Sequence, residues 1–477
     1  MLKLFDPSSS LPVAERGKAP VAITSFFAGK PLVLDEKVKA GQIDDYVTPT
    51  FYAPNVSWLV QRNGMNPRHS LMVSLNGSEG NHMHANGISM ELYGKGYVLG
   101  PDAGIGKTLY QGLDYLEYYS QFPSHNTVCV DGISSYPVMK SNHSFKLRAL
   151  YPAAGERLPY QPISYSEVYF REPETFADQT RLNGIVNVGD SAGYYIDVFR
   201  SRKVEGGDKM HDYFYHNLGQ HMTLTAADGS ELGLQPTQEL AFAGAHLYAY
   251  SYIYNKKRAV TSKDVKAGFT IQMPDKDDIT MNLWMKGEEG REIFSALSPM
   301  TEGLSRIKNM PYSIKDQPTL TFVARQKGEA WNRPFVAVYE PSTVKEPSCI
   351  ASVDYPQVKS EQQGSHVGIR VALTNGNVDW ILSSDENTHH CKLEKLQVRA
   401  SYALCRQSEK GETLQTFLGN GTQLEADGVS IRTDASADVL LLKQDGKWMY
   451  TATAPCRVVV GKKKYTLSVS KELRLLK

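Results

Sequence analysis

The sequence is poor in cysteine, in excess charge of either sign and in long apolar runs. Its five cysteines, at positions 129, 349, 391, 405 and 456, form an odd and dispersed set without a CxxC pair. This pattern excludes a disulfide framework and a cysteine-based zinc site. We expect free, buried thiols, with one bridge among Cys391, Cys405 and Cys456 only if the compartment is oxidising.

Charge is nearly balanced, with 52 Lys and Arg against 51 Asp and Glu and a net charge of +1. The overall balance therefore indicates no nucleic-acid partner, although a local basic groove is compatible with it. No apolar run approaches the roughly 18 residues of a membrane span. The first twenty residues, MLKLFDPSSSLPVAERGKAP, lack the apolar core of a signal peptide. We expect either a cytoplasmic protein or a chain numbered after a removed segment.

Helical patterning is also missing, because no window keeps a 3.6-residue apolar stripe over 15 residues. Short strand-like runs separated by Gly, Asn, Asp and Pro predict an all-β fold instead, a large antiparallel β-sandwich followed by a small β domain. We expect an N-terminal arm with edge strands over 1–56 and the sandwich over 57–384. The stretch SSDENTHH (383–390) marks a break, and the small domain follows over 385–477.

Runs of alternating or β-branched residues give the candidate strands. Asn76-Gly77 is typical of a tight turn, and Gly461–Lys464 of a solvated hairpin turn or, alternatively, a polyanion contact. The candidate strands are 58–61, 70–75, 88–93, 97–99, 127–130, 194–199, 221–225, 246–250, 280–284, 401–404, 439–442, 448–450, 457–460 and 465–467.

The chain is organised around the stretch from Gly80 to Gly132. His82 and His84 are two positions apart, so an extended backbone would point both to the same side. Asp102 follows one predicted strand and His125 precedes another. Three strand ends can thus present two imidazoles and a carboxylate, which are ordinary zinc ligands and leave a fourth position open. The alternative is that the histidines are satisfied surface or core groups and that Asp102 is a turn former.

The motifs NHMHANG, GKGYVLGPDAG and SHNTVCVDG resemble those of the heparinase II/III-like polysaccharide lyases, which include alginate and heparan lyases. Two later blocks also fit the family, DVFRSRKVEGGDKMHDYFYHNLG and PTLTFVARQKGEAWNRPFVAVYEP. The resemblance covers roughly 57–341. It implies β-elimination on a uronic-acid polysaccharide, in which the C6 carboxylate is neutralised, a base takes the C5 proton and an acid protonates the departing O4.

The resemblance also assigns site residues. His82 matches the family's catalytic histidine. His84, Asp102 and His125 match its ligands for a structural zinc ion. Tyr110 is the candidate catalytic tyrosine.

The tyrosine assignment leaves alternatives, because the spacing between Asp102 and His125 does not select one residue. Tyr115, Tyr118 and Tyr119 compete with Tyr110, and simple aromatic packing competes with all of them. Asn86 and Tyr119 are candidates for contact with the sugar.

One departure from the family concerns the region ahead of residue 57. Family enzymes carry a helical toroid there, which supplies a carboxylate-neutralising Asn or His and a second Tyr, whereas this sequence shows no such stretch. It resembles the C-terminal β portion, with a helical toroid domain supplied upstream as partner. We expect an acidic polysaccharide or oligosaccharide as substrate, neither nucleic acid nor membrane as partner, and a periplasmic or secreted location.

Two other functions stay open. One is a non-catalytic carbohydrate-binding β-sandwich module that uses exposed aromatics such as those of 248–254. The other is a sugar isomerase or hydrolase that uses His82 and a carboxylate. A hydrolase usually needs a pair of carboxylates, and the sequence offers no convincing pair.

Overall fold

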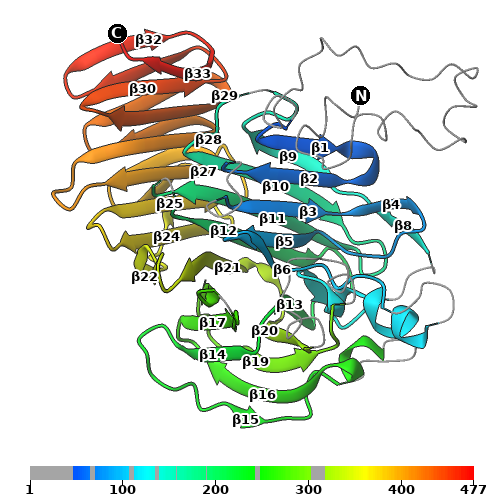
Figure 1. The fold of residues 1–477 in the computed structure, drawn as a ribbon. Coiled ribbons are helices and arrows are strands. Elements are labelled where there is room, and N and C mark those ends of the chain that lie inside the picture. The colour runs from blue at the N-terminus through cyan, green and yellow to red at the C-terminus, as the bar shows by residue number, and fades with distance from the viewer. Residues whose placement is uncertain are drawn as a thin grey trace, which may run out of the picture.

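The structure is a computed structural model, and the residues it describes are almost all in strands and turns (Figure 1). Much of the predicted N-terminal arm, residues 1–46, lies outside them. The described residues are 47–64, 70–106, 112–134, 139–156, 158–189, 191–241, 248–274, 276–301 and 317–477.

Antiparallel pairs build every sheet, as the sequence predicted. The first part of the chain forms a five-stranded sheet in the order β1 (Thr50–Ala53), β2 (Trp58–Arg62), β3 (Met72–Asn76), β5 (Ser89–Gly94) and β6 (Tyr97–Gly100). A separate pair consists of β4 (Ser78–Asn81) and β8 (Lys140–His143). The short helical segments are η2 (Pro54–Val56), η3 (Tyr115–Tyr119), η4 (Phe122–Ser124) and η5 (Tyr248–Tyr252).

Two further sheets complete the sandwich. One has eight strands in the order β14 (His221–Ala226), β17 (Val265–Ile271), β18 (Ile279–Met285), β21 (Ala330–Thr343), β12 (Gly193–Lys203), β11 (Ala177–Asn187), β10 (Ile163–Arg171) and β9 (Lys146–Tyr151). The other has six strands in the order β15 (Gln235–Pro236), β16 (Tyr254–Thr261), β19 (Arg291–Ser298), β20 (Thr319–Lys327), β13 (Met210–Asn217) and β7 (Val128–Val130).

The last part of the chain forms one twelve-stranded sheet, drawn in yellow to red in Figure 1. Its main path is β22 (Ile350–Asp354), β24 (His366–Leu373), β25 (Val378–Ser384), β27 (Leu396–Gln407), β28 (Thr413–Ala426), β29 (Val429–Gln444), β30 (Lys447–Ala452) and β33 (Ser470–Leu475). Beside it pair β23 (Lys359–Ser360), β26 (Cys391–Leu393), β31 (Cys456–Val460) and β32 (Lys463–Leu467).

The eight-stranded sheet is the middle layer, because both of its faces are buried. Along β12, Tyr195 and Phe199 belong to the core shared with the five- and six-stranded sheets. Tyr194 and Val198 belong instead to the core shared with the twelve-stranded sheet. Successive strand residues point to opposite faces, so a strand buried on both sides needs a continuous apolar run. This requirement explains the apolar residues of the sequence YYIDVF in β12, where the one charged residue, Asp197, is paired with Arg181.

A buried ion pair joins the middle layer to the C-terminal sheet. Arg406 donates two hydrogen bonds to Asp379, of 2.6 and 2.7 Å. The Tyr194 hydroxyl of β12 donates to the same carboxylate at 2.5 Å, and Arg406 also donates to the Asn187 carbonyl at 2.9 Å. Charged groups with this many partners fix the relative placement of the two sheets.

The predicted domain boundary at residue 385 falls inside the twelve-stranded sheet. Strand β25 ends at Ser384 and pairs with β24 before the break and with β27 after it. The stretch SSDENTHH is therefore a loop between strands of one sheet. Loop composition marks where a strand ends, but it does not reveal which strands then pair.

Most predicted strands are confirmed, and two local predictions are wrong. Residues 248–250, predicted as part of a strand, lie in the 3-10 helix Tyr248–Tyr252, while 246–247 lie outside the described residues. Asn76-Gly77 does not close a hairpin, because β3 pairs with β2 and β5 whereas β4 pairs with β8. The turn at Gly461 does close a hairpin between β31 and β32.

The five cysteines are all free and buried, as the sequence predicted. Among the described residues, no helix has the length and apolarity needed to cross a membrane.

Two buried histidines predict loss of stability in acid. Burial lowers the pKa of His143 to about 4 and that of His216 to about 3, so both are neutral in the folded protein near pH 7. In the unfolded chain the two histidines take up protons from about pH 6.5 downward. Because the folded protein does not bind these protons until the pH is near 4, the free energy of unfolding decreases as the pH falls from about 6.5 to 4. For His143 the loss is on the order of 3 kcal/mol.

Urea unfolding at pH 7, 5.5 and 4.5 checks this expectation. Carboxyls with raised pKa values, such as Asp438 at about 6, act in the opposite direction. The decisive quantity is therefore the difference between wild type and His143→Gln. The variant should lose less stability than wild type over this interval, and equal losses in the two proteins would contradict the assignment.

Candidate functional site

A tight hairpin places Asp102 at the site. Strands β5 and β6 are joined by Lys95 and Gly96, whose φ angles of 54° and 86° are both positive. A two-residue turn with φ above zero at both positions matches the right-handed twist of the strands it joins. The Lys95 ammonium is held by Glu346 at 2.9 Å. Strand β6 ends at Gly100, so Asp102 follows a strand end, as predicted.

His84, Asp102 and His125 form one cluster, which we call the histidine cluster. The His125 Nδ1 lies 2.9 Å from the Asp102 Oδ2. The rings of His84 and His125 stack with centroids 4.9 Å apart and planes 14° apart. The structure thus brings together the three residues that the motifs singled out, although they come from three separate segments of the chain.

Two acceptors surround the His125 ring. Its Nδ1 faces the Asp102 carboxylate, and its Nε2 lies 3.2 Å from the Tyr119 carbonyl oxygen. Neither acceptor can donate a proton, and a neutral imidazole has one N–H. Both contacts can be hydrogen bonds at once only when the ring carries two protons. The cluster therefore contains more hydrogen-bond acceptors than donors.

Among the described residues, three buried polar atoms on the other side of the cluster have no hydrogen bond of ordinary geometry. They are the His84 Nδ1, the Asn86 Oδ1 and the Tyr115 hydroxyl, and the Tyr115 ring meets that of His84 edge-on at 6.3 Å. Burial, together with the nearby His125, lowers the pKa of His84 to about 4. A neutral imidazole with a free lone pair is the form that binds a metal ion.

Carboxylate charge also gathers here. Burial acts to raise the pKa of Asp102, but the neighbouring His125 outweighs it and holds this pKa below its ordinary value. Burial and the nearby Asp102 raise the pKa of Glu91, which accepts hydrogen bonds from Asn76 at 2.6 Å and Tyr93 at 2.8 Å. Glu91 was missed at the sequence level because it lies within a strand.

These residues fit a zinc ion in donor type, since zinc accepts imidazole and carboxylate. The fit requires some rearrangement. Among the described residues, the donor groups that come within 4.8 Å of one another belong to a different set, His366, Asp385 and His389. In the histidine cluster, the unpartnered nitrogen of His84 would have to move toward Asp102 and His125.

His82 lies at the end of β4 and is exposed. Its backbone N–H donates to the Met139 carbonyl at 2.7 Å, and its φ is 60°. The strand ends at Asn81, so the alternation expected for an extended backbone does not apply to His82 and His84. A left-handed conformation is uncommon outside glycine, although histidine is among the residues that adopt it more readily.

Three of the four tyrosine candidates occupy a buried π-helical turn, η3. Tyr110 lies outside the described residues. Tyr115, Tyr118 and Tyr119 are all buried, and the Tyr119 hydroxyl donates to the Met300 carbonyl at 2.7 Å. In this arrangement Tyr119 faces protein backbone. Single π-helical turns are rare and often occur at functional sites.

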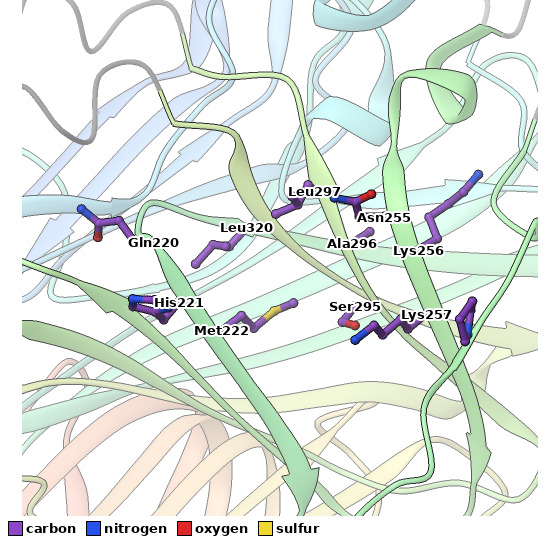
Figure 2. Close-up of a pocket in the computed structure, with 11 residues that line it drawn as sticks. Gln220, His221, Met222, Asn255, Lys256, Lys257, Ser295, Ala296, Leu297 and Leu320 are labelled. Carbon is purple, nitrogen blue, oxygen red and sulfur yellow. The ribbon is translucent and has the colours of Figure 1, made fainter.

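A separate groove of ≈ 580 Å³ lies between the edge strand β14 and the six-stranded sheet. Figure 2 shows residues of the β14 side facing residues of β16, with those of β19 and β20 between them. Its polar lining consists of Gln220, His221, Asn255, Lys256, Lys257 and Ser295. The sequence offered only a weak signal for this groove, the pair Lys256-Lys257.

Comparison with known proteins relates the chain to polysaccharide lyases. It is 27% identical over 435 residues to an endo-acting ulvan lyase of Formosa agariphila, covering 86% of this chain and 51% of that protein. The chain therefore spans about half the length of this curated relative.

Similar solved structures include a heparinase III gene product, with a TM-score of 0.40, 13% identity, and coverage of 75% of this chain and 44% of that one. The heparan sulfate lyase HepC from Pedobacter heparinus gives a TM-score of 0.37 with 14% identity, covering 76% of this chain and 45% of that one. Because both TM-scores are below 0.5, neither structure identifies the fold or the activity of this chain.

The model of the endo-acting ulvan lyase C-terminal domain matches residues 356–443. The chain is thus similar to an endo-acting ulvan lyase over most of its length, and its residues 356–443 are similar to the C-terminal domain of such lyases.

Proposed function

We propose that this chain is the β-structured C-terminal portion of a polysaccharide lyase that cleaves a uronic-acid polysaccharide by β-elimination. The observation that carries the proposal is the histidine cluster, in which His84, Asp102 and His125 converge from three motif segments, with His82 two residues before His84 in the chain. The sequence relative is named an endo-acting ulvan lyase, so ulvan is the first substrate to test.

The reaction needs a base at C5, an acid at O4 and neutralisation of the C6 carboxylate. His82 is exposed, and its imidazole is a side chain of the kind that takes and gives protons in catalysis. A tyrosine needs help to act as a base, since its ordinary pKa is about 10. Donors aimed at the developing enolate-like charge would supply further stabilisation. We propose that a helical domain supplies the carboxylate-neutralising group.

A zinc ion at His84, Asp102 and His125 forms part of the proposal. Its role is structural, because it would hold the three segments that shape the site. The stacked rings of His84 and His125 and the two acceptors around His125 support it. We expect His84→Ala, purified without chelator, to contain one equivalent of zinc less than wild type by elemental analysis. Equal zinc contents in the two proteins would remove this site.

The activity test uses the ultraviolet absorbance of the unsaturated uronate that β-elimination creates. The natural gene product and the chain described here are each assayed on ulvan, alginate, heparan sulfate and hyaluronan. Absorbance that rises with one of these polymers supports the lyase. Release of saturated sugars would place the protein among the hydrolases, and absence of turnover by the natural gene product on every polymer would oppose catalysis.

We also propose that the protein acts in the periplasm or outside the cell, where its polymeric substrate is accessible. Fractionation of the producing cells tests the location. Recovery of the protein in the cytoplasmic fraction alone would contradict it.

A second candidate function is non-catalytic carbohydrate binding, and the groove in Figure 2 favours it. Tyr254, 43% exposed, precedes Asn255 at its rim. Lys257 lines the groove and has no ion-pair partner among the described residues. Aromatic faces and ammonium groups together suit an anionic sugar chain.

Calorimetric titration with anionic oligosaccharides tests this second function. Lys257→Ala should weaken binding and reduce its dependence on salt, because the variant removes a charge. Tyr254→Ala should weaken binding at every salt concentration. Unchanged affinity in both variants would exclude the groove as the binding site.

A further inference from the structure

A second group of metal-binding side chains lies in the C-terminal sheet, away from the histidine cluster. His366 begins β24, Asp385 follows β25, and His389 lies in the loop before β26. One donor atom from each lies within 4.8 Å of the other two. All three side chains are half-buried. We call this group the sheet-end cluster.

The backbone leaves a small space between two of these donors. A Cβ atom added to Gly364 would lie 2.7 Å from the Asp385 Oδ1 and 3.0 Å from the His389 Nδ1. It would also lie 3.1 Å from the Cε1 of His366. Asp385, His389 and His366 therefore all border the space next to the Gly364 Cα, and the side chain of any other residue at position 364 would fill this space.

The His389 Nδ1 is buried and has no hydrogen-bond partner in the part of the chain that the structure describes. Leaving a buried polar atom without a partner costs about 1 to 3 kcal/mol. The rings of His389 and His366 meet edge-to-face with centroids 5.4 Å apart. A cation between them would satisfy the orphaned nitrogen.

Hydrogen bonds fix the Asp385 carboxylate in place. Its Oδ2 accepts from the Trp331 indole N–H at 2.8 Å, and its Oδ1 accepts from the Ser365 amide at 2.9 Å. An ionised carboxylate has about four acceptor sites, so each oxygen can still bind a metal. Such outer partners are the ones that orient metal ligands in proteins.

The tautomer of His366 can be read from its partners. Its Nε2 lies 3.2 Å from the Gln362 carbonyl, which only accepts, so this nitrogen carries the hydrogen in a neutral ring. Its Nδ1 then carries the lone pair, beside the Ser384 hydroxyl at 3.1 Å and the Cys391 thiol at 3.4 Å. Cys391 contacts only this one member of the cluster and is not counted among its donors.

We propose that His366, Asp385 and His389 bind one divalent transition metal ion, with zinc the best match to two imidazoles and a carboxylate. Tetrahedral zinc with bonds of about 2.0 to 2.2 Å holds its donors roughly 3.3 Å apart, so small side-chain movements close the cluster. Its place at one end of the β24–β25 pair, linked through Trp331 to β21, gives it a structural role. It ties the loop 385–390 to the junction between the C-terminal sheet and the sandwich.

Gly364→Ala tests the site without removing a ligand. The added methyl group fills the space that the metal would occupy, and the φ of Gly364 is not in the left-handed region, so the backbone accepts alanine. Gly189→Ala is the matched control, because a Cβ there meets nothing within 4 Å. We expect Gly364→Ala and His389→Gln each to lose one equivalent of zinc by elemental analysis, and Gly189→Ala to lose none.

Two measurements keep the result separate from the histidine cluster and from misfolding. In a His84→Ala background, any remaining zinc should disappear on adding Gly364→Ala. Cobalt added to chelator-treated His84→Ala protein should produce visible absorption bands, and Gly364→Ala should abolish them while circular dichroism stays unchanged. Zinc content and cobalt spectra that are equal with Gly and Ala at 364 would overturn the site, whatever the outcome of the lyase assay.

Discussion

Replacing His82 with asparagine in the natural gene product should lower lyase turnover by about 10²- to 10⁴-fold, the range that a positioned acid or base contributes. The variant removes the imidazole but keeps a residue that tolerates the left-handed backbone. His82 has a φ of 60°, and asparagine is several-fold enriched in that conformation. His82→Ala should reduce turnover equally but carries the additional backbone strain.

The controls separate catalysis from structure. His82 is exposed and its backbone amide bonds to Met139, so His82→Asn should keep the zinc content and the unfolding midpoint of wild type. The rate should fall in kcat more than in KM, because a proton-transfer group acts mainly in the transition state. Wild-type turnover in His82→Asn would remove the proposed role, and a loss of both zinc and stability would assign His82 to the fold.

Local patterns in the sequence predicted the parts of this site that depend on nearby residues. The hairpin that ends before Asp102 follows from a Gly-Lys-Gly turn between two apolar runs. Strand β7 after His125 follows from the run TVCV. Both patterns involve contacts within a few residues, and for that reason they can be read without knowing the rest of the fold.

The pairing of distant strands could not be predicted in this way. Strand β4 leaves the sheet of its sequence neighbours and pairs with β8, about sixty residues later. The left-handed turn at His82 occurs where this pair ends, so no alternation rule could place its side chain. The composition of the loop at Asp385 similarly indicated a domain boundary, because composition alone does not show that β25 pairs with strands on both sides of this loop.

Buried charged residues could not be predicted from the sequence for the same reason, and Arg181 is the clearest example. Its guanidinium is fully buried in β11 and donates to Asp197 at 2.8 and 2.7 Å. It also donates to the carbonyl oxygens of Ile88 at 2.7 Å and Asn126 at 2.6 Å. Asn126 is next to His125, so this one side chain connects the middle sheet to the histidine cluster.

Arg181→Met should therefore destabilise the protein by about 3 to 5 kcal/mol, the cost of leaving one member of a buried ion pair without its partner. The free energy of unfolding of a typical domain is about 5 to 15 kcal/mol, so the variant will unfold at a much lower urea concentration than wild type. The exposed pair of Arg457 and Asp434 gives the matched control, and Arg457→Ala should leave the midpoint almost unchanged.

A double variant separates the lost charge pairing from the lost packing. Asp197→Asn in the Arg181→Met background removes the uncompensated carboxylate, so it should recover part of the stability that the single variant loses. Arg181→Lys keeps the charge but cannot reproduce four bonds in fixed directions. It should fold and yet bind the zinc ion that we propose for the histidine cluster less tightly, because the Asn126 carbonyl loses its donor. An Arg181→Met midpoint equal to that of wild type would show that the ion pair contributes nothing, and the connection between sheet and cluster would then need another explanation.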